Sequence, residues 1–313
     1  MIYLPLIMGS LGLKDFLSLA DLDTKQIQGL LSRAFDLKTA KKADCPLIGK
    51  SLVLIFRKPS MRTRLSFEVG MYQLGGQAIG LSMQGIGLGE REPVKDAARV
   101  FARYAHGIVL RTYAHTEVLE LAQYADIPVI NGLDDLEHPC QALADIFTIQ
   151  EKKGTLKGLK LVYVGDGNNV CHSLMQGASK VGMEMVVASP RGYQPKKEIV
   201  KKIQGSRVKG QVSVVEDPRE AVAGADIIYT DVWTSMGREK EAIKRKKIFK
   251  DYQLNSKLVS LAKKDALIMH CLPAHRGEEI TDEVFESKNS VIFDQAENRL
   301  HAQKAILVEL LGG

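Results

Sequence analysis

Cysteine is scarce in this chain, and no apolar run is long enough to span a bilayer. The four cysteines form no Cys-x-x-Cys pair and have no metal-ligand spacing, a usage that fits a reducing cytoplasm. The apolar segment 1–8 lacks the cationic region and the cleavage site of a signal peptide, and translation starting at Met8 is an alternative explanation of it. We therefore expect a cytoplasmic protein without a membrane anchor and without a metal site.

A strong charge of one sign is also missing. The 313 residues carry a net charge of +6, with 26% charged and 45% hydrophobic residues, as in a globular enzyme rather than a disordered chain. The mild positive excess is compatible with small anionic substrates and is weak evidence for nucleic acid. The length predicts two domains of about 150 residues each.

Short apolar stretches alternate with amphipathic segments along the chain, which predicts α/β layering with parallel sheets. We place a doubly wound domain at 1–147 and a second at 148–294, with the junction near 146–156, where a stretch rich in lysine and glycine begins. The predicted strands are 51–56, 77–81, 107–110, 128–130, 160–164, 185–189, 211–215, 226–230, 266–269 and 290–293. The predicted helices are 24–42, 60–74, 93–105, 115–124, 139–152, 170–181 and 295–311.

Polar clusters follow the carboxyl ends of most of the predicted strands. Ligands bind at these ends in open α/β sheets, so two such sheets facing each other would form a cleft where the clusters converge. The clusters begin at Ser60, Arg111, His138, Gly165, Asp231 and His270.

The first cluster, Ser60-Met61-Arg62-Thr63-Arg64, opens a helix after an apolar strand and Pro59. Serine is a common helix N-cap and arginine is common on exposed faces, so an ordinary helix start is the simpler interpretation. However, the helix dipole favours acidic residues in the first turn, and two arginines there are unfavourable unless an anion compensates. With the free backbone N–H groups, these side chains predict an anion site, and phosphate fits it best.

The clusters after the next two strands are weaker signals by themselves. Arg111 ends a strand, where a solvated arginine is common, and only the predicted cleft favours a functional role. His138 precedes Pro139 at a helix start with Gln141 at the third helical position, so a capping histidine and a surface glutamine are the alternatives. As functional residues, His138 and Gln141 would donate hydrogen bonds to a carbonyl or phosphoryl oxygen.

The segment Gly165-Asp166-Gly167-Asn168-Asn169 follows a strand and resembles the start of a dinucleotide fingerprint. It lacks the third glycine, where Val170 stands, and no acidic residue follows the next strand near residue 189. We therefore exclude NAD binding and expect the asparagines to bind a polar small ligand.

The strand that ends at Asp231 is followed by a loop of small and flexible residues, so the carboxylate could bind an ammonium group. Seven basic residues lie between Arg238 and Lys250, but Glu239 and Glu241 interrupt them and no aromatic platform is interleaved. This basic run predicts a solvated helix face rather than a nucleic-acid surface.

The motif His270-Cys271-Leu272-Pro273 places a thiol at a strand end that faces the predicted cleft. Most free cysteines are inert core residues. A nucleophilic cysteine needs a nearby base, and His270 cannot easily serve because adjacent strand residues point to opposite faces. We therefore interpret Cys271 as a substrate contact. No recognisable metal spacing is present among His270, His275, Glu278 and Glu279.

Together these motifs resemble the ornithine carbamoyltransferases of the aspartate/ornithine carbamoyltransferase family. The resemblance runs from about Asp15 to the C-terminus and includes a further motif from Phe293 to Arg299. The 60–64 motif is shared across the wider family, whereas the loop Ser235-Met236-Gly237 and the motif at Cys271 are specific to ornithine. The resemblance implies a carbamoyl phosphate domain, an ornithine domain, a final helix (295–313) packing back on the first domain, and homotrimers or assemblies of trimers with active sites at subunit interfaces.

The resemblance also implies a reaction and a set of roles. The carbamoyl group of carbamoyl phosphate would pass to the δ-amine of L-ornithine, giving L-citrulline and phosphate, in arginine biosynthesis or, in reverse, in arginine catabolism, without a metal or an organic cofactor. The phosphate would be held by Ser60, Met61, Arg62, Thr63 and Arg111, and the carbamoyl group by His138 and Gln141. Ornithine would be bound by Asn169, Asp231, Ser235 and Met236, and the reacting carbonyl surrounded by Cys271, Leu272 and Arg299. The expected catalytic residues are Arg62, Arg111, His138, Asp231 and Cys271.

The chain departs from the family pattern at two positions. Met61 stands where many members have threonine, a change that a backbone contact tolerates. Members usually carry glutamine or histidine in a loop that reaches the phosphate of a neighbouring subunit, and alignment on Glu92-Pro93 places Gly87 there. We expect Gln84 or Arg91 to replace that contact.

Two other functions are alternatives. A carbamoyltransferase for putrescine or an N-acylated ornithine would share most of these residues, although Asp231 favours free ornithine because an α-ammonium group needs a carboxylate partner. A non-catalytic binding or regulatory protein that keeps the fold is the second alternative, supported only by Gly87 and the basic run.

Overall fold

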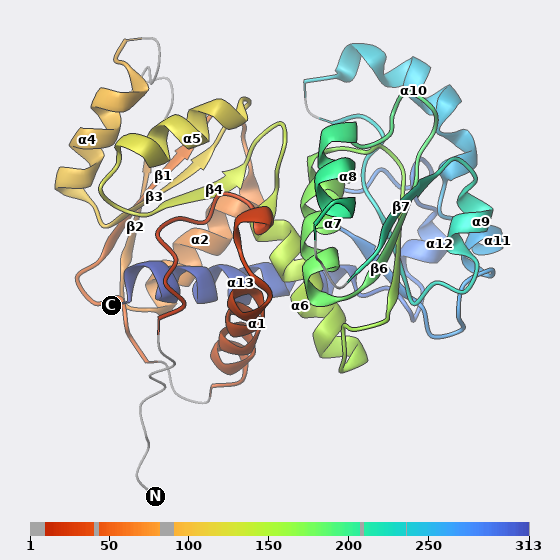
Figure 1. Cartoon of the computed structure of the whole chain (residues 1–313), viewed down its shortest axis with the longest axis horizontal. Coiled ribbons are helices and arrows are strands. Elements are labelled where there is room, and N and C mark those ends of the chain that lie inside the picture. The colour runs from red at the N-terminus through yellow and green to blue at the C-terminus, as the bar shows by residue number, and fades with distance from the viewer. Residues whose placement is uncertain (1–9, 41–43, 82–90, 207–209, 236, 313) are drawn as a thin grey trace, which may run out of the picture.

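The computed structural model describes residues 10–40, 44–81, 91–206, 210–235 and 237–312. These residues form a four-stranded and a five-stranded sheet, both parallel, with helices on both faces, which confirms the predicted fold class. The sheets lie on opposite sides of the molecule, with helix α6 (Pro139–Lys153) passing from one to the other (Figure 1). Met8, Gln84, Gly87 and Met236 lie outside the described residues.

The first sheet has the order β2-β1-β3-β4. Its strands are β1 (Ser51–Phe56), β2 (Gln77–Leu81), β3 (Gly107–Arg111) and β4 (Val129–Leu133). Alternate side chains of β1 enter different apolar clusters, one with α4 (Val94–Tyr104) and α5 (His115–Tyr124), the other with α1 (Thr24–Thr39) and α2 (Met61–Gln73). The central strands are apolar throughout because helices cover both faces.

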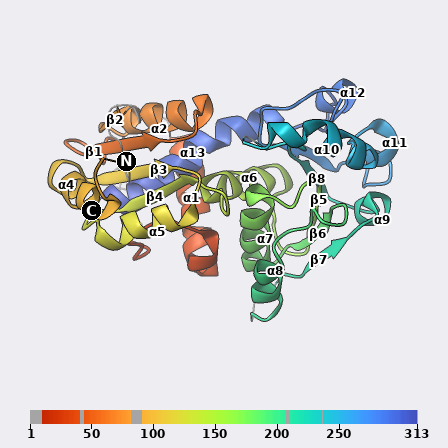
Figure 2. The ribbon, with the colours of Figure 1, turned by 90° about the horizontal axis from the view of Figure 1, so that it is seen from above.

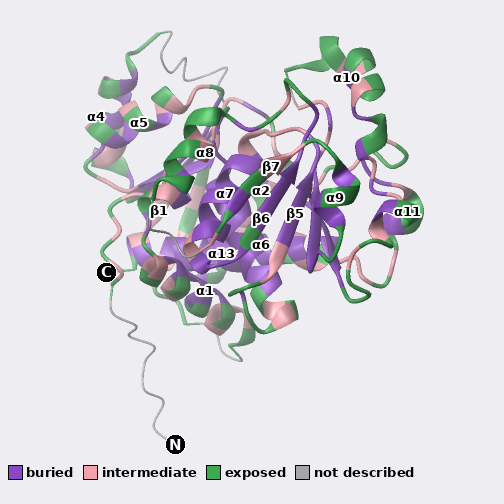
Figure 3. Cartoon of the chain, turned by 45° about the vertical axis from the view of Figure 1, so that its right-hand side comes forward, coloured by how far each residue is buried: buried purple, intermediate pink, exposed green. Residues whose placement is uncertain are grey.

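The second sheet has the order β7-β6-β5-β8-β9. Its strands are β5 (Lys160–Val164), β6 (Glu184–Ala188), β7 (Val212–Val215), β8 (Ile227–Thr230) and β9 (Leu267–His270). Helices α7 (Asn169–Val181) and α8 (Lys197–Gln204) pack with one face. The other carries the short helices α9 (Pro218–Val222), α10 (Ala242–Ile248), α11 (Ser256–Val259) and α12 (Asp282–Phe285). Figure 3 shows β5 and β6 buried and parts of α10 and α11 exposed.

One apolar cluster runs through both halves of the chain. It joins Leu54 of β1 and Phe147 of α6 to Tyr163 of β5 and Met175 of α7 without interruption. Within the described ranges, 3-10 turns lie at Leu19–Asp21, Glu239–Glu241 and Lys250–Tyr252. No helix among the described residues is both long enough and apolar enough to cross a membrane.

The final helix, α13 (Ile292–Leu311), packs back on the first domain, as predicted. It lies against α1, α2 and α6 and also contacts β9, so it extends from the second sheet across the first (Figures 1 and 2). The predicted strand 290–293 is wrong, because α13 already begins at Ile292 and only an isolated bridge joins Ser290 to Ile268. The short apolar run there is the buried first turn of the helix. The other nine predicted strands are present.

Candidate active site

A cavity of about 630 Å³ opens where the carboxyl ends of strands from both sheets meet. It lies beside β1 and β3 in the first sheet and beside β5, β8 and β9 in the second, where the strand order reverses and open α/β sheets bind ligands. Residues from both halves line it, so the predicted convergence of the polar clusters is present. The predicted residues lining it are Ser60, Met61, Arg62, Thr63, Arg111, His138, Asn169, Asp231, Ser235, Cys271, Leu272 and Arg299.

The amino end of α2 forms one wall of the cavity. Ser60 is its N-cap, with Oγ accepting a hydrogen bond from the backbone N–H of Thr63 over 3.3 Å. Arg62 lines the cavity, whereas Arg64 pairs with Glu68 over 2.8 Å on the exposed side. The expectation that both arginines point to one anion site is therefore wrong for Arg64, because a glutamate one turn along the helix neutralises it.

Three guanidinium groups meet at this wall, from Arg62 of α2, Arg111 of β3 and Arg299 of α13. Burial, together with the charges of Arg299 and Arg62, lowers the pKa of Arg111 to about 10. Nε of Arg111 and Nε of Arg299 are buried and lack a partner among the described residues. Such a cluster is unfavourable by itself, and an anion with several acceptor oxygens would stabilise it.

The imidazole of His138 lies beside these arginines at the N-cap of α6. Its side chain makes no capping hydrogen bond, so the capping explanation for this histidine is wrong. Burial, followed by the charges of Arg299, Arg111 and Arg62, lowers the pKa of His138 well below its usual range. The ring is therefore neutral at pH 7, and its buried Nδ1 lacks a partner in the described part of the chain. A neutral imidazole can donate from one nitrogen to a substrate oxygen.

Gln141 lies behind the cavity wall rather than on its surface. It is buried, which excludes the surface alternative, and it does not line the cavity. Its Oε1 accepts a hydrogen bond from Nη1 of Arg299 over 2.5 Å, and Nη2 of Arg299 donates to Oγ1 of Thr63 over 3.0 Å. The amide of Gln141 thus supports the guanidinium that reaches the cavity.

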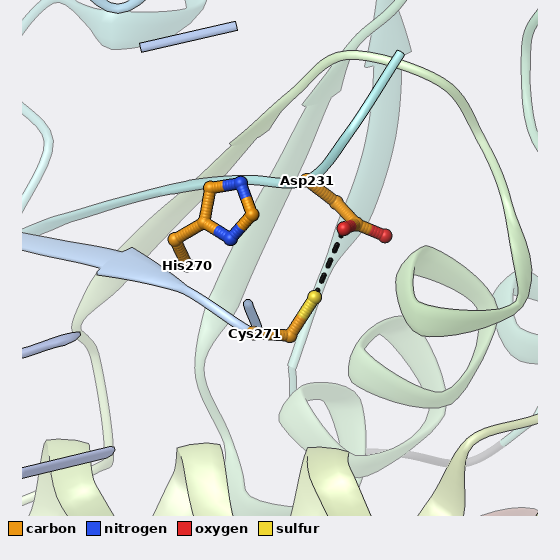
Figure 4. Close-up of side chains that lie close together, drawn as sticks. All are labelled: Asp231, His270 and Cys271. Atoms are coloured by element: carbon orange, nitrogen blue, oxygen red, sulfur yellow. Dashed lines mark hydrogen bonds between the residues drawn. The ribbon is translucent and has the colours of Figure 1, made fainter. Parts of the chain in front are cut away.

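The second domain contributes a carboxylate with three donors. Asp231 follows β8, and its oxygens accept hydrogen bonds from Nδ2 of Asn168 over 2.7 Å, the backbone N–H of Val232 over 2.8 Å and the thiol of Cys271 over 3.0 Å. Figure 4 shows the Cys271 contact. Asn169 lines the cavity nearby and donates from Nδ2 to the carbonyl of Asp134 over 2.6 Å. The Asp231 carboxylate is thereby fixed at the cavity wall.

His270 has its own partners and makes no hydrogen bond with Cys271 or Asp231 in Figure 4. Its Nε2 lies 3.1 Å from Glu279 Oε1, and its Nδ1 accepts from the backbone N–H of Leu272 over 2.9 Å. Leu272 has a φ of 59°, in the region that favours glycine, so this bond holds a strained residue beside the cavity. His270 therefore shapes the loop and is not poised as a base for the thiol.

Two groups of possible metal ligands lie here, although the sequence spacing predicted none. Within each group the ligand atoms lie within 4.8 Å of one another. Several already have protein partners, since Asp231 accepts from Cys271 and Glu278 pairs with Lys246 over 2.7 Å. The groups are Asp231, His270 and Cys271, and His275, Glu278 and Glu279.

The basic run is not entirely a solvated face. Arg245 is buried, and its guanidinium pairs with Asp166 over 2.8 Å and donates to the carbonyl of Trp233 over 2.8 Å. The predicted surface role is therefore wrong for Arg245, which ties the glycine-rich loop after β5 to the loop that carries Ser235. The sequence concealed this because the carboxylate lies 79 positions earlier.

Lys58 is a charged cavity residue that the sequence did not single out. Lys58 lines the cavity, lies over the ring of Tyr113 at 4.5 Å, and has a pKa lowered by burial and by the charge of Arg111. The sequence feature that could have identified Lys58 is its position between a buried strand and Pro59, because residues at the carboxyl end of a strand face the ligand crevice.

Two family models match consecutive parts of the chain. The aspartate/ornithine carbamoyltransferase carbamoyl-P binding domain matches residues 14–151, and the Asp/Orn binding domain of the same family matches residues 157–310.

Relatives with curated names are similar over almost their whole length. Ornithine carbamoyltransferase of Carboxydothermus hydrogenoformans is 55% identical over 304 residues, covering 96% of this chain and 98% of the relative. The anabolic ornithine carbamoyltransferase of Pyrococcus furiosus is 53% identical, with 97% and 98% covered. The solved ornithine carbamoyltransferase structure from Pyrococcus furiosus superimposes with a TM-score of 0.94 at 52% identity, covering 97% of this chain and 99% of that one. The Thermus thermophilus structure gives a TM-score of 0.88 at 43% identity, with 96% and 99% covered.

Proposed function

The chain belongs to the aspartate/ornithine carbamoyltransferase family, and we infer that it transfers the carbamoyl group of carbamoyl phosphate to the δ-amine of L-ornithine, giving L-citrulline and phosphate. The observation that carries this assignment is the cavity that joins a cluster of three arginines to a fixed carboxylate. The arginines suit a dianionic phosphate and the carboxylate suits an ammonium group. The relatives named for ornithine favour it over putrescine or an N-acylated ornithine as acceptor.

The carbamoyl phosphate site would form at the amino end of α2. Ser60, Arg62 and Thr63, with the backbone N–H of Met61, would hold the phosphate together with Arg111. The convergence of positive charge and the free N–H groups of the helix end support this assignment. Carbamoyl phosphate would bind first, because its charge neutralises the cluster on which the rest of the site depends.

The carbamoyl group would lie between the two domains. Neutral His138 would donate to its carbonyl oxygen, and Arg299 with the backbone around Cys271 and Leu272 would surround the same group. Gln141 donates one amide N–H to Asp145, and its second N–H would reach the carbamoyl group from behind the cavity wall. These donors would stabilise the oxyanion of a tetrahedral intermediate.

Ornithine would enter from the second domain. Asp231 would bind its α-ammonium group, with Asn169, Ser235 and Met236 around the α-carboxylate end. The neutral δ-amine attacks the carbamoyl carbon and forms the C–N bond. The C–O bond to phosphate then breaks, phosphate leaves with the bonding electron pair toward Arg62, and the nitrogen loses a proton. Positioning of the two substrates supplies most of the rate enhancement.

We also propose a homotrimer, or an assembly of trimers, in the cytoplasm. The edge strand β2 leaves Ile79 exposed, and the outward face of α2 leaves Met61, Leu65 and Tyr72 exposed, although Met61 also borders the cavity. An exposed apolar face beside an unpaired strand edge favours association with another subunit. A neighbour could then supply Gln84 or Arg91 to the phosphate. Synthesis and breakdown of citrulline would use the same residues.

The test is an assay of the carbamoylated product formed from carbamoyl phosphate and an amine, which is citrulline when the amine is ornithine. We expect turnover with L-ornithine at least about a hundredfold above turnover with putrescine or N-acetylornithine. Putrescine lacks the α-carboxylate and N-acetylornithine lacks the free α-ammonium group that the site would bind. Absence of citrulline formation by the purified wild-type protein, at a level above its Arg62→Ala variant, would refute the assignment and favour a binding protein.

A further inference from the structure

The side chain of Asp145, one turn after Gln141 on α6, is buried at the boundary between the two domains. Its Oδ1 accepts hydrogen bonds from Nε2 of Gln141 and from Nε2 of Gln295, each over 2.7 Å. Its Oδ2 accepts from the hydroxyl of Tyr229 over 3.0 Å. These three donors come from three different elements, α6, α13 and β8, so the carboxylate joins both halves of the molecule.

The hydrogen bonds continue from this carboxylate to both sides of the cavity. On one side, Gln141 accepts from Arg299, which donates to Thr63 at the amino end of α2. On the other side, Oε1 of Gln295 accepts from the backbone N–H of His270, the residue before Cys271. Tyr229 lies two residues before Asp231 on β8. A single hydrogen-bonded residue thus connects Asp145 to the end of β9, next to Cys271, and to the end of β8, next to Asp231.

The carboxylate dictates which way the amide of Gln141 faces. Above its raised pKa of about 7, Asp145 is an ionised carboxylate that only accepts, so the nitrogen of the Gln141 amide must face Asp145 and its oxygen must face Arg299. Reversal of the amide would place two donors against each other at Arg299 and two acceptors against each other at Asp145, which costs more than the loss of one neutral hydrogen bond.

We propose that Asp145 is a positioning residue for carbamoyl phosphate, which acts through the amide of Gln141 to fix the guanidinium of Arg299 at the cavity wall. The residue does not line the cavity and touches no substrate. This inference rests on the proposed function, because Arg299 is assigned there to the carbamoyl end of the substrate.

The decisive variant is Asp145→Asn, which keeps the shape and removes the charge. The asparagine amide can present either its oxygen or its NH2 group to Gln141, so the orientation of Gln141 is no longer imposed. We expect the KM for carbamoyl phosphate to rise at least about tenfold and kcat to fall, while the KM for ornithine changes less than about threefold. A purely structural role would lower the active fraction, and hence kcat, with both KM values unchanged.

Tyr229→Phe is the matched control, because it removes the hydrogen bond to Oδ2 and leaves Gln141 bound to Oδ1. We expect both KM values of this variant within about threefold of the wild type. An unchanged KM for carbamoyl phosphate in Asp145→Asn, or an equal rise in Tyr229→Phe, would overturn the proposal.

If Asp145→Asn does not accumulate as folded protein, Asp145→Ser takes its place, because serine also removes the charge and has a smaller side chain. We expect the same rise in the KM for carbamoyl phosphate, and an unchanged KM would again overturn the proposal. Circular dichroism establishes folding in each case. A wild-type protein that forms no citrulline refutes the proposed function itself, whereas an active wild type with an unaffected Asp145 variant refutes only the role of Asp145.

Discussion

The thiol of Cys271 donates a hydrogen bond to Oδ1 of Asp231 over 3.0 Å. Burial raises the pKa of the Cys271 thiol well above its usual range, and the neighbouring carboxylate of Asp231 raises it further. The sulfur therefore stays protonated at physiological pH, whereas only the thiolate form would act as a nucleophile. This cysteine donates to a carboxylate at the cavity wall and is not poised as a covalent catalyst, whereas its contact with the substrate stays a prediction.

Replacement of Cys271 by serine should preserve the donor to Asp231 with a shorter bond to its oxygen. We expect kcat to fall by less than about tenfold, since the change affects one hydrogen bond. Iodoacetamide at pH 8 should label exposed Cys45 far faster than Cys271, as peptide mass spectrometry would show. Complete loss of turnover in Cys271→Ser would instead indicate a covalent role.

Replacement of Arg62 by alanine should reduce kcat/KM for carbamoyl phosphate by roughly 10²–10³-fold, because a charged donor to the phosphate is lost. The matched control is Arg64→Ala in the same helical turn, where the guanidinium pairs with Glu68 at the surface. We expect a change of less than about threefold there. Steady-state kinetics with carbamoyl phosphate varied would measure both, and equal losses in the two variants would argue against a specific phosphate contact.

The rate should rise with pH from about 6 to 9, because the δ-amine of ornithine must lose a proton to attack and its pKa resembles that of lysine. His138 should add no inflection in this range, since its pKa is held well below the usual value and the ring is already neutral. The measurement is log(kcat/KM) for ornithine against pH, with an expected slope of about one. A flat profile would exclude the neutral amine as the nucleophile.

Stability should depend on pH through Asp145. Burial raises the pKa of this carboxyl from 3.8 to about 7 in the folded state. Between about pH 4 and pH 7 the folded protein therefore keeps a proton on Asp145 that the unfolded chain releases. The stabilisation by the protonated carboxyl is fully present below about pH 4 and is lost as the pH rises to about 7. The free energy of unfolding falls by about 4 kcal/mol over this range. Thermal unfolding of wild type and Asp145→Asn at pH 5 and pH 7.5 should show a larger decline for the wild type. Parallel declines would contradict this assignment.

The oligomer should depend on the outward face of α2. Tyr72 is 82% exposed there, and Tyr72→Glu would place a charge in the proposed subunit contact. We expect the mass in light scattering after gel filtration to fall from that of a trimer to that of a single chain. Leu261→Glu, an exposed leucine in the second half, is the control and should leave the mass unchanged. A trimer that survives Tyr72→Glu would place the contact elsewhere.

The sequence predicted the location of the site because strand ends in parallel sheets share one edge. Ser60, Arg111 and Asp231 each follow an apolar stretch that could only be a buried strand, so their convergence required no knowledge of which strands pair. The helix starts at Met61 and Pro139 were also predictable, since a serine cap and a proline at the first helical position are local signals.

The supports behind the site could not be predicted in the same way. Asp145 meets Gln295 across 150 positions, and Arg245 meets Asp166 across 79, so neither pair has a local signal. Arg245 looks like any solvated arginine in a basic run until its partner is placed. The strand predicted at 290–293 failed for a related reason, because a short apolar run at a helix start resembles a buried strand.

The position of α13 has a consequence for how the protein is made. Its residues Ala302, Ala305 and Ile306 complete the apolar core against α1, α2 and α6, although they leave the ribosome after all three of those helices. A nascent chain that ends near residue 290 exposes that uncovered surface, however complete its strands are. The core of the first half thus stays incomplete until α13 is synthesised, and a chain that stops before α13 would present the uncovered surface to chaperones and proteases.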